Sequence, residues 1–248
     1  MLGRAPSKTL QIEVVRTVFK EDPKIVLAAV GPELNREPTL SRMPLDLEPV
    51  DGLHFEDLAG LFVSTPFNHG IVGMTIRQVA YIFGLTRRSG AKRAIEIGRW
   101  RGGTTVALAG AMGDGGKLWS IDVGEKEARV FHGRGLKFDE ETREFLDRFG
   151  FDVELIVGDS RTLEVETGEV DLVLVDGDHT YEGVKIDVER WGRRVRVGGA
   201  LLLDDAVDEP IFGSHAETAG RVMQELLDEG DFALRAQVDR LAHLERVR

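Results

Sequence analysis

The distribution of apolar positions divides this chain near residue 90. From Ala91 onward, short apolar runs alternate with amphipathic segments. This alternation predicts a parallel sheet covered by helices on both faces. The expected strands are Arg93–Ile97, Leu118–Ile121, Val153–Val157, Val170–Val175, Ala200–Leu203, Phe232–Ala236 and Leu241–Leu244. The expected helices between them are Thr104–Met112, Glu140–Phe149, Tyr181–Val195 and Ala216–Asp228.

The last two apolar runs are separated by too few residues for a crossover helix, so they are expected to form an antiparallel hairpin. The run Val170–Val175 is almost continuously apolar, which is typical of a central strand buried on both sides. The predicted fold class is therefore α/β, with a Rossmann-like, doubly wound sheet of seven strands that ends in an antiparallel hairpin.

Residues 1–90 have a different pattern, in which prolines interrupt short helical segments. One longer helix is expected over Thr75–Leu85, where apolar residues recur at helical spacing. We interpret residues 1–90 as a mainly helical extension and residues 91–248 as the sheet domain. Two segments, Phe62–Gly73 and Asp205–His215, mix aromatic residues, glycine and histidine (His69 and His215 among them), as loops over a pocket do. The extension is therefore a candidate lid.

Composition narrows the function classes. The 248 residues carry 32 Lys+Arg and 43 Asp+Glu, a net charge of −11, which disfavours nucleic acid as a partner. The densest basic group lies in a predicted helix and is interpreted as a solvated face: Arg190, Arg193, Arg194 and Arg196. Cysteine is absent, Met1–Lys8 lacks the apolar core of a signal peptide, and no apolar run approaches a membrane span. These features predict a cytoplasmic protein with no membrane partner.

A glycine-rich segment follows the first expected strand, where ligands gather in open α/β sheets. Gly98, Gly102 and Gly103 let the backbone approach a ligand closely. Their spacing lacks the middle glycine of the dinucleotide fingerprint. The acidic Glu96 would repel a phosphate but attract a positively charged amino group. The turn therefore favours a nucleoside that carries an amino acid.

Polar residues follow the next two expected strands. Asp122 is placed to accept hydrogen bonds from ribose hydroxyls, although a helix cap or a loop aspartate is an alternative interpretation. Asp159 could accept a hydrogen bond from an adenine amine, and Ser160 follows it directly. Together with Glu96 beside the first strand end, Asp122 and Asp159 place polar residues at three successive strand ends, which favours a nucleoside site.

In these residues the chain resembles the class I S-adenosylmethionine (SAM)-dependent methyltransferases over roughly Ala91–Arg248. The segments Glu96–Thr105 and Asp176–Glu182 are similar to motifs of the metal-dependent O-methyltransferases of sugars and natural products, which are related to the catechol O-methyltransferases. The resemblance implies SAM as cofactor. The predicted cofactor-binding set is Glu96, Gly98, Gly102, Thr104, Asp122, Asp159, Ser160 and Asp176.

Aspartates also follow the fourth and fifth expected strands. Asp176, Asp204 and Asp205 would meet at one edge of the sheet, and without Lys or Arg partners they would repel one another unless a cation neutralised them. Hard divalent ions prefer such oxygen ligands, so Mg²⁺ is predicted here, where it would lower the pKa of an acceptor hydroxyl. The family resemblance implies the same three metal ligands. Alternatively, Asp204 and Asp205 cap a helix or flank a loop.

His179 is the candidate general base, because imidazole titrates close to neutral pH. Asp176 or Asp178 is the alternative. The predicted activity is Mg²⁺-assisted O-methylation of a small hydroxylated acceptor such as a sugar, a catechol or a natural product. Two alternatives stay open, a metal-independent methyltransferase that uses His179 and a SAM-binding module without turnover. A homo-oligomer is compatible with the sequence.

Overall fold

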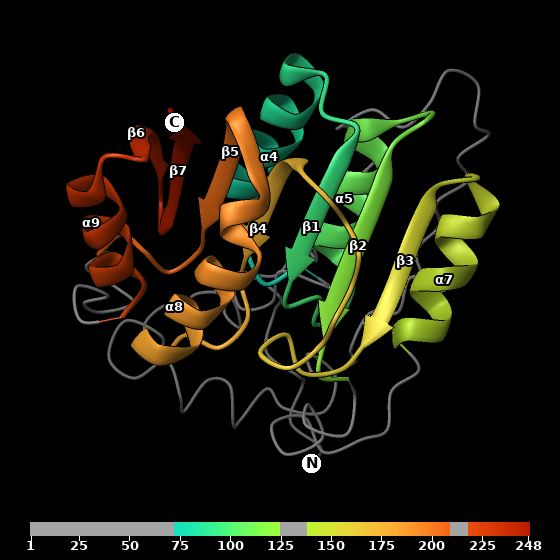
Figure 1. Cartoon of the computed structure of the whole chain (residues 1–248). Helices are drawn as coiled ribbons and strands as arrows, with labels where there is room; N and C mark the ends of the chain where they lie inside the picture. The colour runs from blue at the N-terminus through green and yellow to red at the C-terminus, as the bar shows by residue number, and fades with distance from the viewer. Residues whose placement is uncertain (1–71, 125–137, 209–217) are drawn as a thin grey trace, which may run out of the picture.

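The computed structural model describes residues 72–124, 138–208 and 218–248. Its strands form one seven-stranded sheet (Figure 1). In chain order they are β1 (Arg93–Ile97), β2 (Lys117–Asp122), β3 (Asp152–Val157), β4 (Val170–Val175), β5 (Val195–Leu203), β6 (Phe232–Val238) and β7 (Leu241–Arg246). The helices are α4 (Ile76–Ser89), α5 (Gly103–Met112), α7 (Phe138–Arg148), α8 (Tyr181–Arg190), the 3-10 turn η3 (Gly192–Arg194) and α9 (Ala219–Glu229).

The strand order is β3-β2-β1-β4-β5-β7-β6. Strands β1 to β5 are parallel to one another, whereas β7 is antiparallel to both β5 and β6. The predicted seven-stranded α/β fold with a terminal antiparallel hairpin is confirmed. Because the parallel strands share one carboxyl edge, the segments that follow β1, β2, β4 and β5 meet there.

Helices cover both faces of the sheet (Figure 1). On one face α4, α5 and α7 pack over alternate residues of the central strands, including Ala94, Leu118 and Leu172. On the other face α8 and α9 pack over the intervening residues, including Ile95 and Val173. This alternation is why the central strands have nearly continuous apolar sequences.

Helix α4 belongs to the first of these two layers. Thr75 caps its N-terminus through a reciprocal pair of hydrogen bonds with Gln78, and Gly90 ends it in the left-handed conformation. Val79 and Ile82 are fully buried in the same core as α5. The last residues of the predicted extension therefore pack onto the sheet, whereas residues 1–71 lie outside the described part of the chain.

The predicted helix Tyr181–Val195 is too long. Helix α8 ends at Arg190, the chain continues through η3, and β5 already begins at Val195, five residues before the expected strand. The sequence pattern did not reveal this start, because the pairing of β4 and β5 is irregular between Val170 and Leu172 and the facing segment of β5 is exposed from Arg196 to Gly198.

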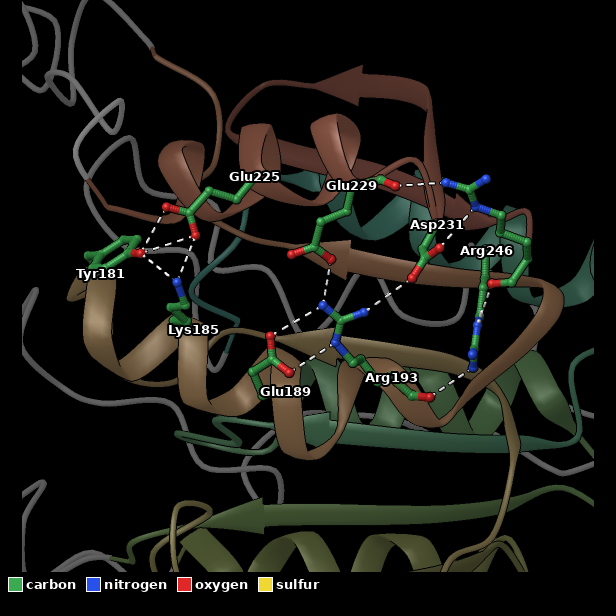
Figure 2. A network of polar contacts seen from close by, with 9 residues as sticks. Tyr181, Lys185, Glu189, Arg193, Glu225, Glu229, Asp231 and Arg246 are labelled. Carbon is green, nitrogen blue, oxygen red and sulfur yellow. Dashed lines mark hydrogen bonds and ion pairs between the residues drawn. The ribbon is translucent and has the colours of Figure 1, made fainter.

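The arginine-rich segment is also not a simple solvated face. Arg193 contacts Glu189 of α8, Glu229 of α9 and Asp231, so it joins the two helices (Figure 2). Its carbonyl oxygen accepts a hydrogen bond from Arg246 of β7. The other three arginines bond to carbonyl oxygens or to acidic side chains: Arg190, Arg194 and Arg196. The contacts of Arg193 thus join α8, α9 and the terminal hairpin, whereas those of the other three arginines attach this segment to residues 160–171.

No helix among the described residues is long and apolar enough to cross a membrane.

Candidate active site

The glycine-rich turn after β1 is packed against the ends of the two neighbouring strands. Gly98 has a φ of 88°, and a Cβ atom there would overlap the carbonyl oxygen of Asp176. The Gly98 N–H donates to Ile121 O at 2.9 Å, and the Asp176 N–H donates to Ile97 O at 2.8 Å. Only glycine fits both the conformation and the space, so the turn and Asp176 are held in contact.

Gly102 is needed for a different reason. It is the N-cap of α5 with a φ of 83°, and a Cβ atom would overlap the side chain of Thr142 in α7. Thr104, in the first turn of α5, is buried. The geometry therefore explains Gly102 by helix packing, and its predicted cofactor contact stays a prediction.

Sequence reasoning missed Arg99, although it lies inside the glycine-rich motif. Its side chain is buried, forms two 2.9 Å bonds with the Asp139 carboxylate at the start of α7, and donates to Ser120 O at 2.7 Å. Arg99 thereby fixes α7 against the turn. One sequence feature could have pointed to this role: Arg99 lies in the turn directly after a buried strand, where an arginine side chain needs acidic or carbonyl partners.

Asp122 holds the backbone of the turn. Its Oδ2 atom accepts hydrogen bonds from the N–H groups of Arg99 and Trp100, both at 2.9 Å, and its Oδ1 atom accepts one from Gly124 at 2.7 Å. Carboxylate oxygens have further lone pairs, so these bonds leave capacity for a ribose hydroxyl. The predicted ribose contact remains a prediction.

Glu96 is fully buried beneath the turn. Its Oε2 atom accepts hydrogen bonds from Thr105 Oγ1 and Ser120 Oγ, both at 2.5 Å, whereas Oε1 has no hydrogen-bond partner among the described residues. Burial raises the pKa of this carboxyl from 4.5 to about 7, although the two hydroxyl groups and Arg99 oppose the rise. The unpartnered oxygen is a buried acceptor for which a cofactor amino group or a bound water is a suitable donor.

The two predicted residues after β3 have other partners. Asp159 is paired with Arg161 at 2.8 Å, and hydrogen bonds from Arg161 lower the pKa of Asp159. Arg161 also lies 3.6 Å from Asp178, across the sheet edge. Ser160 Oγ donates to Asp187 of α8 at 2.6 Å. The structure therefore links this segment to the loop after β4, and the predicted adenine contact of Asp159 stays a prediction.

Asp176, Asp204 and Asp205, which we call the acidic rim, meet as the sequence predicts. Val175 and Leu203 are register partners in β4 and β5, so the aspartates that follow them are neighbours. Burial and the charges of neighbouring carboxylates raise the pKa of Asp176 well above its ordinary value. Burial also raises the pKa of Asp204, although Arg240 opposes this. The three carboxyls are thus close enough to repel one another.

The expectation that the acidic rim lacks a basic partner is wrong. Arg240, in the turn between β6 and β7, approaches Asp205 Oδ1 to 2.6 Å and Asp204 Oδ2 to 4.0 Å. Gln78 of α4 donates to Asp204 Oδ1 at 2.6 Å. Both partners are remote in sequence, 35 or more positions from the aspartates they contact. Only the packing of α4 and the hairpin against the sheet reveals them.

These contacts bear on the predicted Mg²⁺ site. Among residues 72–124, 138–208 and 218–248, no group of three or more His, Cys, Asp or Glu side chains has an arrangement that could hold a metal ion. A guanidinium and an amide already donate to oxygens that a metal would need. The acidic rim as described does not fit the ion, so no catalytic step is derived through it.

His179 lies beside the acidic rim. Its Nδ1 atom is 3.3 Å from Asp205 Oδ2, and its side chain is 54% exposed, whereas that of Asp205 is 12% exposed. Asp205 has a φ of 51°, and the N–H groups of the next two residues, Ala206 and Val207, donate to Arg240 O. The loop thus presents a histidine supported by a buried aspartate at the edge of the glycine-rich turn. His69 and His215 lie outside the described residues.

Comparison with known families agrees with this geometry. Residues 95–206 match the family model described as a methyltransferase domain. The match extends from β1 to the residue after the acidic rim, so it includes the glycine-rich turn, Asp122, Asp176 and His179.

Solved structures with the same fold include O-methyltransferases. NovP is 18% identical with a TM-score of 0.56, and the match covers 73% of this chain and 84% of NovP. TomG from Streptomyces achromogenes, solved with SAM, is 20% identical with a TM-score of 0.52 over 72% and 83% of the two chains. An O-methyltransferase from Bacillus cereus, solved with S-adenosylhomocysteine (SAH), is 17% identical with a TM-score of 0.52 over 70% and 82%. At these identities the likeness establishes the fold.

Residues 95–206 thus match a methyltransferase domain, and the fold of the chain is the one seen in SAM-dependent O-methyltransferases.

Proposed function

We propose that this chain is an O-methyltransferase that transfers the methyl group of SAM to a hydroxyl of a small acceptor, such as a sugar, a catechol or a natural product. The observation that carries the proposal is the His179–Asp205 pair, 3.3 Å apart, at the strand edge that also holds the glycine-rich turn. The fold shared with NovP and TomG supports oxygen as the acceptor atom.

The glycine-rich turn and Glu96 would hold the cofactor. Glu96 Oε1 offers a buried acceptor to its amino group, and the Gly98 conformation brings the turn beside Asp176. Bound SAM supplies an electrophilic methyl group on a sulfonium that is already a good leaving group. The protein's task is therefore mainly to orient the acceptor oxygen and to take up its proton.

His179 is the proposed base. If its Nδ1 proton is donated to Asp205, its Nε2 atom is left as an acceptor for the hydroxyl proton. A buried aspartate that fixes the imidazole tautomer also stabilises the imidazolium that forms. Asp176, whose N–H is bonded to Ile97 O beside the glycine-rich turn, is the alternative base.

Mg²⁺ assistance is the alternative that the motifs after β4 and β5 predict, although the acidic rim as described does not fit the ion. Chelation separates the two mechanisms. With the metal mechanism, ethylenediaminetetraacetate abolishes methyl transfer and Mg²⁺ restores it. With the His179 mechanism, chelation leaves the rate unchanged.

The proposal is tested by methyl transfer from labelled SAM to a panel of catechols, phenols and sugars, scored by SAH release and by the modified atom. Replacing His179 with Ala should lower kcat about 100-fold or more, because the base is lost. The affinity for SAM should stay unchanged, since His179 is assigned no cofactor contact. Methylation of nitrogen alone, or full kcat in His179→Ala, would reject the proposed chemistry.

A further inference from the structure

The acidic rim concentrates negative charge at a buried place. Asp204 is 5% exposed and Asp205 8% exposed, and Glu96 adds to the field at Asp176. Such a group is costly to fold unless a positive charge lies against it. The protein therefore needs a cation at this point, from solution or from its own chain.

Arg240 is positioned to be that cation. Its guanidinium lies 2.6 Å from Asp205 Oδ1 and 4.0 Å from Asp204 Oδ2, and its side chain is 15% exposed. Its carbonyl oxygen accepts hydrogen bonds from the N–H groups of Ala206 at 2.9 Å and Val207 at 3.1 Å. Arg240 is thus attached to the rim loop through both its backbone and its side chain.

The turn that carries Arg240 is fixed from the opposite side. Its neighbour Asp239 has a φ of 51°, accepts a 2.5 Å hydrogen bond from Thr75 Oγ1, and pairs with Arg77 at 3.0 Å. Gln78, one helical turn from Thr75, reaches Asp204 at 2.6 Å. The start of α4 thereby clamps both the hairpin turn and the acidic rim, which leaves Arg240 little freedom to move away.

We propose that Arg240 is a positioning residue that supplies the positive charge of the acidic rim in place of a divalent metal ion, and that it holds Asp205 against His179. Arg240 and His179 contact different oxygens of Asp205, Oδ1 and Oδ2, so the guanidinium fixes the carboxylate whose other oxygen orients the imidazole. The part of this inference that concerns His179 rests on the proposed function. The part that concerns the charge of the acidic rim does not.

The test is Mn²⁺ binding, followed by the electron paramagnetic resonance signal of the aqueous ion, because Mn²⁺ favours carboxylate ligands and needs no substrate. The proteins are wild type, Asp204→Asn, Arg240→Met, Arg240→Lys and the double variant with Arg240→Met and Asp204→Asn. Arg235→Met is the matched control, since Arg235 lies on the same hairpin but pairs with Glu245 instead. Circular dichroism checks that each variant is folded.

We expect Arg240→Met to gain one Mn²⁺ site per chain that the added Asp204→Asn removes. Wild type and Arg235→Met should lack this site because both retain Arg240. Arg240→Lys should lack it because lysine keeps a positive charge at position 240. A wild-type Mn²⁺ site that Asp204→Asn abolishes would overturn the inference, and this comparison does not depend on any Arg240 variant folding. A folded Arg240→Met protein that gains no site would overturn it as well.

Activity gives an independent readout. Arg240→Met should lower kcat about 10- to 100-fold, the loss typical when a residue that orients an active-site group is removed, and leave SAM affinity unchanged. Arg240→Lys should recover part of the loss. If wild type transfers no methyl group while the Mn²⁺ results hold, the proposed function fails and the charge replacement stands. If wild type is active and binds Mn²⁺ at Asp204, the proposed function stands and the charge replacement fails.

Discussion

The Glu96 carboxyl, which lies beneath the glycine-rich turn, makes the stability of the protein depend on pH. Burial raises its pKa from 4.5 to about 7, even though Thr105 and Ser120 donate to it. The folded protein therefore binds this proton more tightly than the unfolded chain does. Its contribution to stability is fully present below about pH 4.5 and is lost as the pH rises to about 7, a loss of about 3 kcal/mol.

Replacing Glu96 with Gln should remove this contribution to the pH dependence. The uncharged amide keeps the shape of the side chain and has no proton to lose. Relative to wild type, the variant should therefore gain up to about 3 kcal/mol of unfolding free energy between about pH 5 and about pH 8. Urea unfolding of both proteins at the two pH values measures the difference.

Two other buried carboxyls with raised pKa values, Asp187 and Asp204, are present in both proteins, and their effects cancel because Glu96 is not a cause of either shift. The Glu96 charge does help to raise the pKa of Asp176, so its removal adds to the gain in Glu96→Gln in the same direction. Parallel pH profiles for wild type and Glu96→Gln would contradict the assignment of a raised pKa to Glu96.

The sequence predicted the position of those candidate residues that directly follow a strand. Gly98, Asp176 and Asp204 could be predicted because each follows a recognisable apolar run. Arg240 and Gln78 could not, since they reach the site from the hairpin turn and from α4, and no local pattern encodes that approach. In the sequence alone, Arg240 could not be distinguished from an arginine on the protein surface.

At the scale of elements, buried strands were the easiest to predict. The predicted bounds of β1 and β4 agree with the structure, because these strands are covered on both faces and their sequences are mostly apolar. The start of β5 was missed, since Arg196 and Val197 lie on an exposed segment with no alternating pattern. For β5, the exposed start of the strand is what the sequence pattern did not reveal.

The contacts of Arg193 give a prediction about how α8 and α9 are joined. Its guanidinium contacts Glu189, Glu229 and Asp231 and is 31% exposed in the side chain (Figure 2). Arg193→Met should lower the free energy of unfolding by about 1 kcal/mol, a value that allows for screening by solvent. Chemical denaturation at low salt measures the loss, and added salt should reduce it because partly exposed ion pairs are screened.

Arg235→Met is again the control, since Arg235 pairs with a single glutamate at a more exposed place. Its loss should be smaller than that of Arg193→Met. Equal losses in the two variants would show that the helix-joining contacts add nothing beyond one surface ion pair.

At the scale of the whole molecule, the sheet order explains why the site forms where it does. The order β3-β2-β1-β4-β5-β7-β6 brings the ends of β1, β4 and β5 side by side, and the antiparallel β7 returns the hairpin turn to the same edge. The short spacing of the last two apolar runs predicted the hairpin. The register of the hairpin could not be predicted, and this register is what brings Arg240 to the acidic rim.

The central claim is that this edge of the sheet binds SAM. Isothermal titration calorimetry of the full chain with SAM, and then with SAH, tests it without an acceptor or a metal ion. We predict one binding site per chain for each ligand, and competition between the two. Absence of binding heat for both ligands, together with an unchanged melting temperature in their presence, would contradict the account.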